Sequence, residues 1–415
     1  QDPAGSSTDK PIIQVGTATD EDGKVTPYTA TISAPLAGTQ GLQKTNYGTL
    51  VLKGANTYTG GTDVLQGTLA LGDGGTITTA DGVSVDAAGA DKATFAIDKT
   101  STFSFDGVIS GAGQFAQTGT GKTTLTATNT YSGGTLISAG TLSVGAEGNL
   151  GNVVGQVTIN GGTLEYSQGF TTSRAIALGA GNGTIQTDDT TNAMVISSAI
   201  SGAGGLTKSG AGTLVLTKNN TYSGGTTITG GTLQLGNGET TGKIGGDVNT
   251  GADADHKGTL VFDMSGDPVF AKTISGAGNV VQSGSDKLTL SGTNTYTGGT
   301  TIDSGTLAVS ADANMGDDSG SLTIGNGTLQ NTAKFTMNRA VVLDNDHAAF
   351  QNDADLTLAG SMSGSTAWSK TGSGKLIIAG DASAAKGTAS ISNGYLQVNG
   401  ELGGNVNLAS GTAAI

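Results

Sequence analysis

The sequence predicts an all-β fold, a right-handed parallel β-helix (β-solenoid) of about 20 rungs, where a rung is one turn of the chain around the helix axis. A long segment recurs along the chain, a shorter echo of 19 residues recurs inside it, and aliphatic residues alternate with threonine. Glycine fills 72 of 415 positions and charged residues only 13%. The chain therefore reads as short strands broken by frequent tight turns.

The long repeat is centred on Asn-Thr-Tyr-(Ser/Thr)-Gly-Gly-Thr. Its tyrosines are separated by 73, 91 and 74 residues, so each long repeat must contain several smaller units. We predict three regions: residues 1–40, an N-terminal segment with the first rungs; residues 41–400, the β-helix; and residues 401–415, a truncated last rung. The copies lie near residues 48–72, 121–145, 212–236 and 286–310, with a degenerate copy at 374–399.

The shorter echo is the interval from Gly48-Thr-Leu to Gly67-Thr-Leu, and we interpret it as one rung. Alternation puts leucines on one strand face and threonines on the other. An α-helix is excluded by the glycine content, and a β-propeller, the alternative, fits neither this echo nor the uneven long spacing. Seven leucines should point inward and stack along one spine: Leu50, Leu52, Leu125, Leu214, Leu216, Leu288 and Leu290.

Charge and cysteine content limit the partners. The net charge of −14 disfavours nucleic acid and anionic membranes as partners. The absence of cysteine excludes disulfides and thiolate chemistry. No apolar stretch approaches the length of a membrane span, so we expect no membrane insertion by this chain. The start at Gln1-Asp2-Pro3 indicates a mature or cloned fragment.

Residues suited to catalysis are few. Only His256 and His347 are available as imidazole bases. The string Gly316-Asp-Asp-Ser-Gly320 resembles a serine-protease motif, but it carries an extra aspartate, and we interpret Ser319 as part of a turn. No phosphate-binding glycine motif is present. We therefore expect no enzyme activity, no catalytic residues and no cofactor.

Two acidic loops contain oxygen ligands of the kind that calcium prefers. One holds Asp253, Asp255 and His256. The calcium-binding nonapeptide of β-rolls is absent, so we expect solvated corners rather than a metal site. The weak calcium candidates in the second loop are Asp344, Asp346, Asp353 and Asp355, beside His347 and Asn352.

The aromatic residues allow two interpretations. The four motif tyrosines, Tyr58, Tyr131, Tyr222 and Tyr296, could form an exposed binding stripe, but their place inside the repeat favours packing between rungs. Trp368 replaces Leu206 of a better preserved copy, which favours a core position over a binding hot spot.

The stretch from Ile200 to Ile228 resembles the passenger-associated transport repeat of type V autotransporters. Ile109–Gly113 and Ile274–Gly278 repeat its Ile-Ser-Gly-Ala-Gly opening. Lys44, Lys208 and Lys370 occupy matching places, and Arg174–Leu178 pairs with Arg339–Leu343. The resemblance implies a precursor with a signal peptide, a passenger and a translocator β-barrel, of which this chain is passenger alone.

The resemblance further implies display on the bacterial outer membrane or release from it. We expect a non-enzymatic adhesin that binds a host cell-surface or extracellular-matrix protein or itself. The alternative is a released effector that engages a host receptor as a signalling ligand or toxin, and an enzyme is a weaker third. Binding should reside in the breaks between repeats, at Asp73–Lys99, Asn237–Lys257 and Ala311–Asp318.

Overall fold

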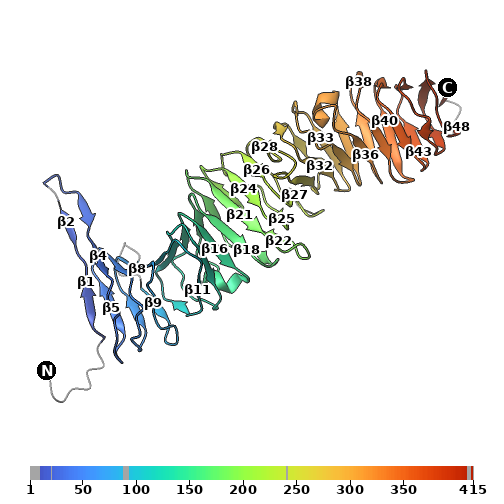
Figure 1. The fold of residues 1–415 in the computed structure, drawn as a ribbon. Helices are drawn as coiled ribbons and strands as arrows, with labels where there is room; N and C mark the ends of the chain where they lie inside the picture. The colour runs from blue at the N-terminus through green and yellow to red at the C-terminus, as the bar shows by residue number, and fades with distance from the viewer. Residues whose placement is uncertain (1–9, 20, 87–92, 240–241, 409–412, 415) are drawn as a thin grey trace, which may run out of the picture. The chain divides into compact units, whose positions relative to one another are not determined.

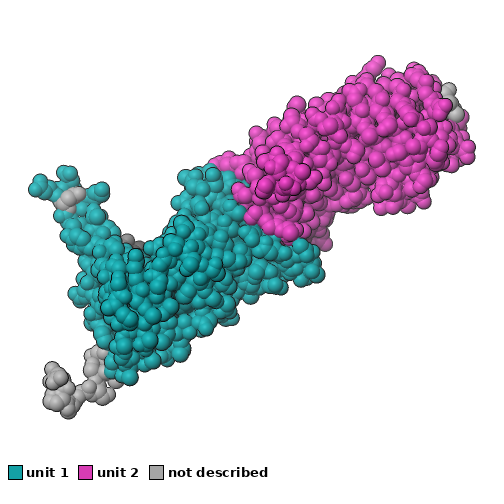
Figure 2. All heavy atoms as spheres, in the orientation of Figure 1, with its two compact units in different colours: residues 1–206 teal, residues 207–415 magenta. Residues whose placement is uncertain are grey.

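The chain folds as a parallel β-solenoid of about 19 turns, which confirms the fold class. The computed structural model describes residues 10–19, 21–86, 93–239, 242–408 and 413–414. These form two compact units, residues 1–206 and 207–415 (Figure 2). Within each unit, short strands stack side by side from rung to rung (Figure 1). Parts of the regions 1–40 and 401–415, and of the breaks at 73–99 and 237–257, lie outside the described residues.

Three sheets make up most of unit 1. Sheet 1a contains β1 (Ile12–Gln14), β5 (Leu42–Thr45), β7 (Thr62–Val64), β9 (Val83–Val85) and β12 (Ile109–Ser110). Sheet 1b contains β4 (Thr29–Ile32), β6 (Thr49–Leu52), β8 (Thr68–Gly72), β10 (Thr94–Asp98), β13 (Gln114–Gln117), β15 (Thr135–Ile137), β17 (Val157–Ile159), β20 (Ile176–Leu178) and β23 (Ile200–Gly202). Sheet 1c contains β11 (Phe103–Phe105), β14 (Lys122–Leu125), β16 (Thr141–Val144), β18 (Thr163–Tyr166) and β21 (Gly183–Thr187). A further pair is β19 (Thr171–Thr172) with β22 (Met194–Ile196), and the 3₁₀ helix η1 spans Glu147–Leu150.

Unit 2 is built in the same way. Sheet 2a contains β24 (Leu206–Ser209), β26 (Thr226–Ile228), β28 (Val248–Asn249) and β31 (Ile274–Ser275). Sheet 2b contains β25 (Thr213–Leu216), β27 (Thr232–Leu235), β29 (Thr259–Phe262), β32 (Asn279–Gln282), β34 (Thr300–Ile302), β36 (Leu322–Ile324), β39 (Val341–Leu343), β42 (Met362–Gly364) and β45 (Ala384–Ala385). Sheet 2c contains β30 (Val269–Phe270), β33 (Lys287–Leu290), β35 (Thr306–Val309), β37 (Thr328–Asn331), β40 (Ala348–Asn352), β43 (Trp368–Thr371), β46 (Ala389–Ile391) and β48 (Val406–Leu408). Sheet 2d contains β38 (Phe335–Met337), β41 (Leu356–Leu358), β44 (Lys375–Ile378), β47 (Gly394–Val398) and β49 (Ala413–Ala414), and η2 spans Asp312–Met315.

The core is a stack of aliphatic residues with the alternation that the sequence predicts. Leu50 and Leu52 of β6 are fully buried, and Leu50 pairs in register with Leu69 on the next rung. Because parallel rungs place like residues above one another, each apolar side chain covers the apolar side chain below it. All seven leucines predicted to point inward are buried.

Those leucines do not share one spine, and this part of the prediction is wrong. In unit 1 the leucines of the first copy lie on β6 in sheet 1b, whereas Leu125 lies on β14 in sheet 1c. In unit 2 Leu214 lies on β25 in sheet 2b and Leu288 on β33 in sheet 2c. Each rung has three sides, and the copies are not separated by a whole number of rungs. If each copy is counted from the strand just before these leucines (β5, β13, β24, β32 or β43), the first strand of each new copy lies in the sheet of the previous copy's second strand.

An antiparallel hairpin before the first repeat copy departs from the parallel pattern. Strands β2 (Thr17–Thr19) and β3 (Val25–Pro27) pair antiparallel, with Thr17 opposite Pro27. Val25 and Tyr28 are exposed there, so the hairpin adds little to the core. It lies before the first repeat copy, where the periodicity gave no signal.

The glycine pair of the motif is required by close packing, and this yields a stability prediction. A Cβ on Gly133 would lie 2.3 Å from the carbonyl oxygen of Gly113 on the neighbouring rung, and Gly134 has φ of +95°. Gly133→Ala should lower the free energy of unfolding by more than about 2 kcal/mol. Gly145→Ala is the matched control, because its Cβ would meet nothing closer than 3.5 Å. Urea unfolding monitored by circular dichroism should separate the two variants, and equal midpoints would contradict the packing argument.

Candidate functional site

In each of the four copies that carry it, the segment Asn-Thr-Tyr-(Ser/Thr)-Gly-Gly-Thr occupies the side of the rung where a third strand would otherwise lie. Between β6 and β7 the chain crosses one side of the helix without a strand, and Tyr58 turns inward there. The Tyr58 hydroxyl bonds the Thr62 hydroxyl at 2.7 Å, and the same bond recurs in the other three copies. All four tyrosines are buried, which confirms packing between rungs and rules out an exposed aromatic stripe.

The motif asparagine joins three successive rungs. In the second copy, Asn129 Oδ1 accepts the backbone N–H of Ile109 at 2.8 Å, while its Nδ2 donates to the carbonyl of Asn149 at 2.7 Å. Each partner is 20 residues away, one rung before and one rung after. The amide therefore replaces the ladder hydrogen bonds that a third strand would supply.

Three lysines at matching places of the repeat are buried at corners of the helix. Lys44, Lys208 and Lys370 are each fully buried, and each Nζ donates to three backbone carbonyls at the corner before the next strand. Burial lowers the pKa of Lys44 and of Lys370 to about 8. The sequence pattern placed these lysines in register but gave no sign of their burial, because lysine is a surface residue in most folds.

Glutamine takes the place of lysine in the alternate copies. Gln117 Nε2 donates to the carbonyls of Gly119 and Gly121, and Gln282 Nε2 donates to those of Gly284 and Asp286. These two copies are also the ones followed by a 3₁₀ helix, η1 or η2. The repeats thus come in two alternating types.

A buried arginine organises the loop behind each 3₁₀ helix. Arg174 pairs with Glu147 of η1 at 2.7 Å and donates to the carbonyls of Asn152 and Gly155. Arg339 does the same in unit 2, pairing with Asp312 of η2 at 2.7 Å. Both guanidinium groups are committed to structure, so neither is free to bind an anion.

The weak calcium candidates bond mainly to neighbouring backbone and amide groups. Asp353 accepts from Gln330 Nε2 at 2.6 Å, and Asp355 accepts the N–H of Lys375. Asp346 accepts the N–H of Ala367, and Asp344 is exposed to solvent. Asn352 of the same segment is buried, and its Nδ2 donates to Asn331 Oδ1. Within the residues that the structure describes, no three His, Cys, Asp or Glu side chains come close enough to hold a metal ion.

The serine and the histidines lie in separate turns. Ser319 donates to Asp317 at 2.6 Å, and this bond lowers the pKa of the Asp317 carboxyl. His256 contacts Asp253, and His347 contacts Asn345. Ser319 thus sits in an aspartate-capped turn, as its sequence context predicts.

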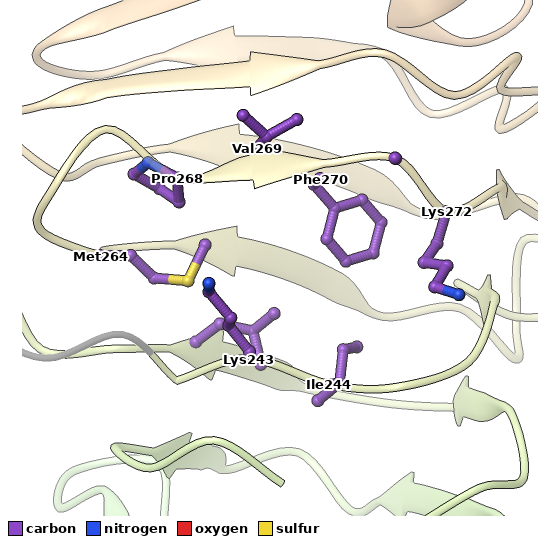
Figure 3. A pocket seen from close by; sticks show the side chains of 9 residues that line it. Lys243, Ile244, Met264, Pro268, Val269, Phe270 and Lys272 are labelled. Carbon is purple, nitrogen blue, oxygen red and sulfur yellow. The ribbon is translucent and has the colours of Figure 1, made fainter. Parts of the chain in front are cut away.

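With the interior filled, the surface open to a partner consists of outward strand faces and the loops that interrupt the repeat. Val153 and Val154 are exposed in the loop behind η1. In unit 2, Lys243 and Ile244 of the break at Asn237–Lys257 border a pocket that also takes Met264 and Phe270 from the next rung (Figure 3). The described residues contain no helix with the length and hydropathy of a membrane span.

The repeat itself identifies the class of protein. The family model of the passenger-associated transport repeat matches residues 42–71, 115–144, 206–235, 280–309 and 369–398, and each range overlaps one of the five copies predicted from the sequence. The chain is an autotransporter passenger. Passengers of this type are displayed on the bacterial outer membrane or released from it.

A relative named as an autotransporter adhesin supports this assignment. The passenger is 36% identical over 205 residues to the adhesin BmaC autotransporter of Brucella suis biovar 1 (strain 1330). The match covers 49% of this chain but only 6% of that protein. No solved structure matches the chain significantly.

The lysine and glutamine copies predict which substitutions this passenger tolerates. Lys208→Gln should lower the free energy of unfolding by about 1 kcal/mol or less, because glutamine already satisfies the same corner in two other copies. Lys208→Met should cost about 1–3 kcal/mol, since it leaves buried carbonyls without donors. Thermal unfolding of both variants checks this, and a methionine variant as stable as wild type would show that the carbonyls need no donor.

A pH dependence follows from the lowered pKa of Lys44 and Lys370. Folded, they lose a proton near pH 8, whereas the unfolded chain keeps it up to the ordinary value of 10.5. The unfolded state binds more protons in this window, so stability should rise as the pH increases from 8 to 10. Above pH 10 the buried tyrosines act in the opposite direction, because burial raises the pKa of Tyr58 to about 12. The double variant Lys44→Gln/Lys370→Gln should flatten the rise between pH 8 and 10 in unfolding midpoints; a rise that persists in it must come from other groups.

Proposed function

We propose that this passenger is a non-enzymatic adhesin that binds a host cell-surface or extracellular-matrix protein, or a second copy of itself. The observation that carries the proposal is the 36% identity to an autotransporter named as an adhesin, over about half of the chain. Because the match spans a small part of that relative, its role comes to this chain as a hypothesis only.

The geometry supports binding over catalysis. The aliphatic residues, motif tyrosines and buried cations are committed to the fold, so recognition must use outward side chains and loops. Ser319, His256 and His347 contact separate partners in separate turns. A nucleophile, a base and an orienting acid are therefore not assembled from these residues.

The proposal predicts that binding and stability separate. Replacing only the exposed side chains of Asp73–Lys99, Asn237–Lys257 or Ala311–Asp318 with serine, one segment at a time, should leave the melting temperature within a few degrees, because the buried residues of β9, β10, β28 and η2 stay in place. At least one replacement should reduce attachment to immobilised matrix proteins, to cultured cells or to itself by about tenfold or more. Plate binding and sedimentation measure the two kinds of attachment.

Two controls sharpen the result. Thr213→Ser/Thr232→Ser/Thr259→Ser changes an outward strand ladder without touching a loop, and it should keep full binding. Ser319→Ala should also keep every activity. A purified wild-type chain that attaches to nothing would refute the adhesin proposal, and loss of activity in a folded Ser319→Ala variant would refute the non-enzymatic part.

A further inference from the structure

Unit 2 has a small apolar pocket on one side of the helix. Its volume is about 160 Å³, and its lining includes Leu235, Ile244, Met264, Pro268 and Phe270. Figure 3 shows the Phe270 ring pointing toward Ile244 and Met264 lying between Pro268 and Lys243, while Val269 points away. A dry apolar cavity of about 150 Å³ is large enough to bind a benzene ring.

Two lysines belong to the same pocket. Lys243 and Lys272 line it from neighbouring rungs, and both are exposed. Within the described part of the chain, neither makes an ion pair. In a chain with net charge −14, these two lysines place positive charge at the edge of an apolar hollow.

The nearby carboxylates bond groups of the fold. Asp247 accepts the N–H of Thr273 at 2.9 Å, and Asp267 accepts the N–H of Lys287 at 3.1 Å. Asp263 accepts from Gln234 Nε2 at 3.0 Å. Their positions are thus fixed by backbone and amide donors and not by the two lysines.

The equivalent turn of unit 1 is filled. Phe105 pairs with Leu125 as Phe270 pairs with Leu290, so Lys99 corresponds to Met264 and Phe103 to Pro268. The Lys99 Nζ lies 4.6 Å from the centre of the Phe103 ring and donates to the carbonyls of Gly72 and Gly75. This comparison shows that the fold accepts a closed form of the turn, and that unit 2 carries smaller or uncharged residues there.

We propose that this pocket binds one apolar side chain of about the size of phenylalanine from an acidic segment of a partner protein. The ring enters between Met264, Ile244 and Phe270, and flanking carboxylates pair with Lys243 and Lys272. The apolar lining by itself would accept any apolar side chain of this size. The two lysines favour a partner that has acidic residues beside that side chain. This inference rests on the proposed binding function and names the chemistry of its partner.

The direct test uses short blocked peptides and methyl NMR. The first probe has one central phenylalanine flanked by glutamates, the second has alanine at the centre, and the third has glutamines as flanks. The first should shift the Met264 and Ile244 methyl signals in a saturable way. The alanine peptide should bind about tenfold more weakly or worse. The glutamine peptide should also bind more weakly and with less dependence on salt. A first peptide that gives no saturable shift, or a glutamine peptide that binds equally well, overturns the proposal.

Variants taken from unit 1 provide the matched controls. Met264→Lys/Pro268→Phe copies the filled turn and should abolish peptide shifts at the Ile244 methyl while the melting temperature stays within a few degrees. Lys243→Glu/Lys272→Glu should also abolish the peptide shifts, because it repels the flanking glutamates. Lys334→Glu/Lys386→Glu makes the same change of charge elsewhere on unit 2 and should keep the shifts. Full peptide binding by the filled variant would place the peptide elsewhere.

Attachment assays on the same variants separate the two proposals. A wild-type chain that adheres to cells or matrix but ignores all three peptides leaves the adhesin function standing and refutes the pocket. A chain that binds the first peptide in the pocket but attaches to no surface refutes the adhesin function and leaves the pocket intact. If the filled variant loses attachment while the Lys334→Glu/Lys386→Glu control keeps it, the pocket is the site through which the adhesin attaches.

Discussion

Every rung must satisfy its backbone hydrogen bonds before it can bury a core, and this constraint decides where the unusual residues of the chain lie. Where a rung has three strands, ladder hydrogen bonds to the strands of the neighbouring rungs satisfy its backbone groups. Where the motif crosses a side without a strand, side chains replace them: the Asn129 amide, the Tyr131–Thr135 hydroxyl pair and the glycines that let backbones approach. Lys44, Gln117 and Arg174 serve the corner carbonyls in the same way. Only 13% of the residues are charged, yet several of the lysines and arginines are buried at these corners.

Much of this could be predicted from the sequence because it repeats. The alternation of leucine and threonine determined the inward face, and the place of Tyr58 inside the motif indicated packing. Two features needed the structure. Periodicity says which positions are equivalent but not which side of the helix each copy reaches, so the single leucine spine was wrong. It also says nothing of burial for a charged residue such as Lys208, whose partners are backbone carbonyls that every sequence contains.

The spacing of the copies has a geometric origin. Between the start of the first copy at β5 and the start of the second at β13, the chain passes along eight strands, β5 to β12, and two sides without a strand. Because each rung has three sides, this is one side more than three full rungs. Each new copy therefore begins one side further around. The lysine and glutamine types alternate as well, so equivalent residues such as Lys44 and Lys208 are 164 apart. The sequence thus distributes its strandless sides, and the loops beside them, around the helix.

Repetition of the scaffold also shows where selection for function can be sought. Residues that satisfy the backbone are the same in both units: Arg174 and Arg339 pair with an acidic residue in the same helix position, and all four tyrosines bond a threonine. Outward positions differ, as the exposed Val154 does from the exposed Ser319 in the loops behind η1 and η2. Since these outward differences leave the rung geometry unchanged, stability does not require them. Differences of this kind, rather than the conserved motif, are where two otherwise equivalent units acquire separate binding properties.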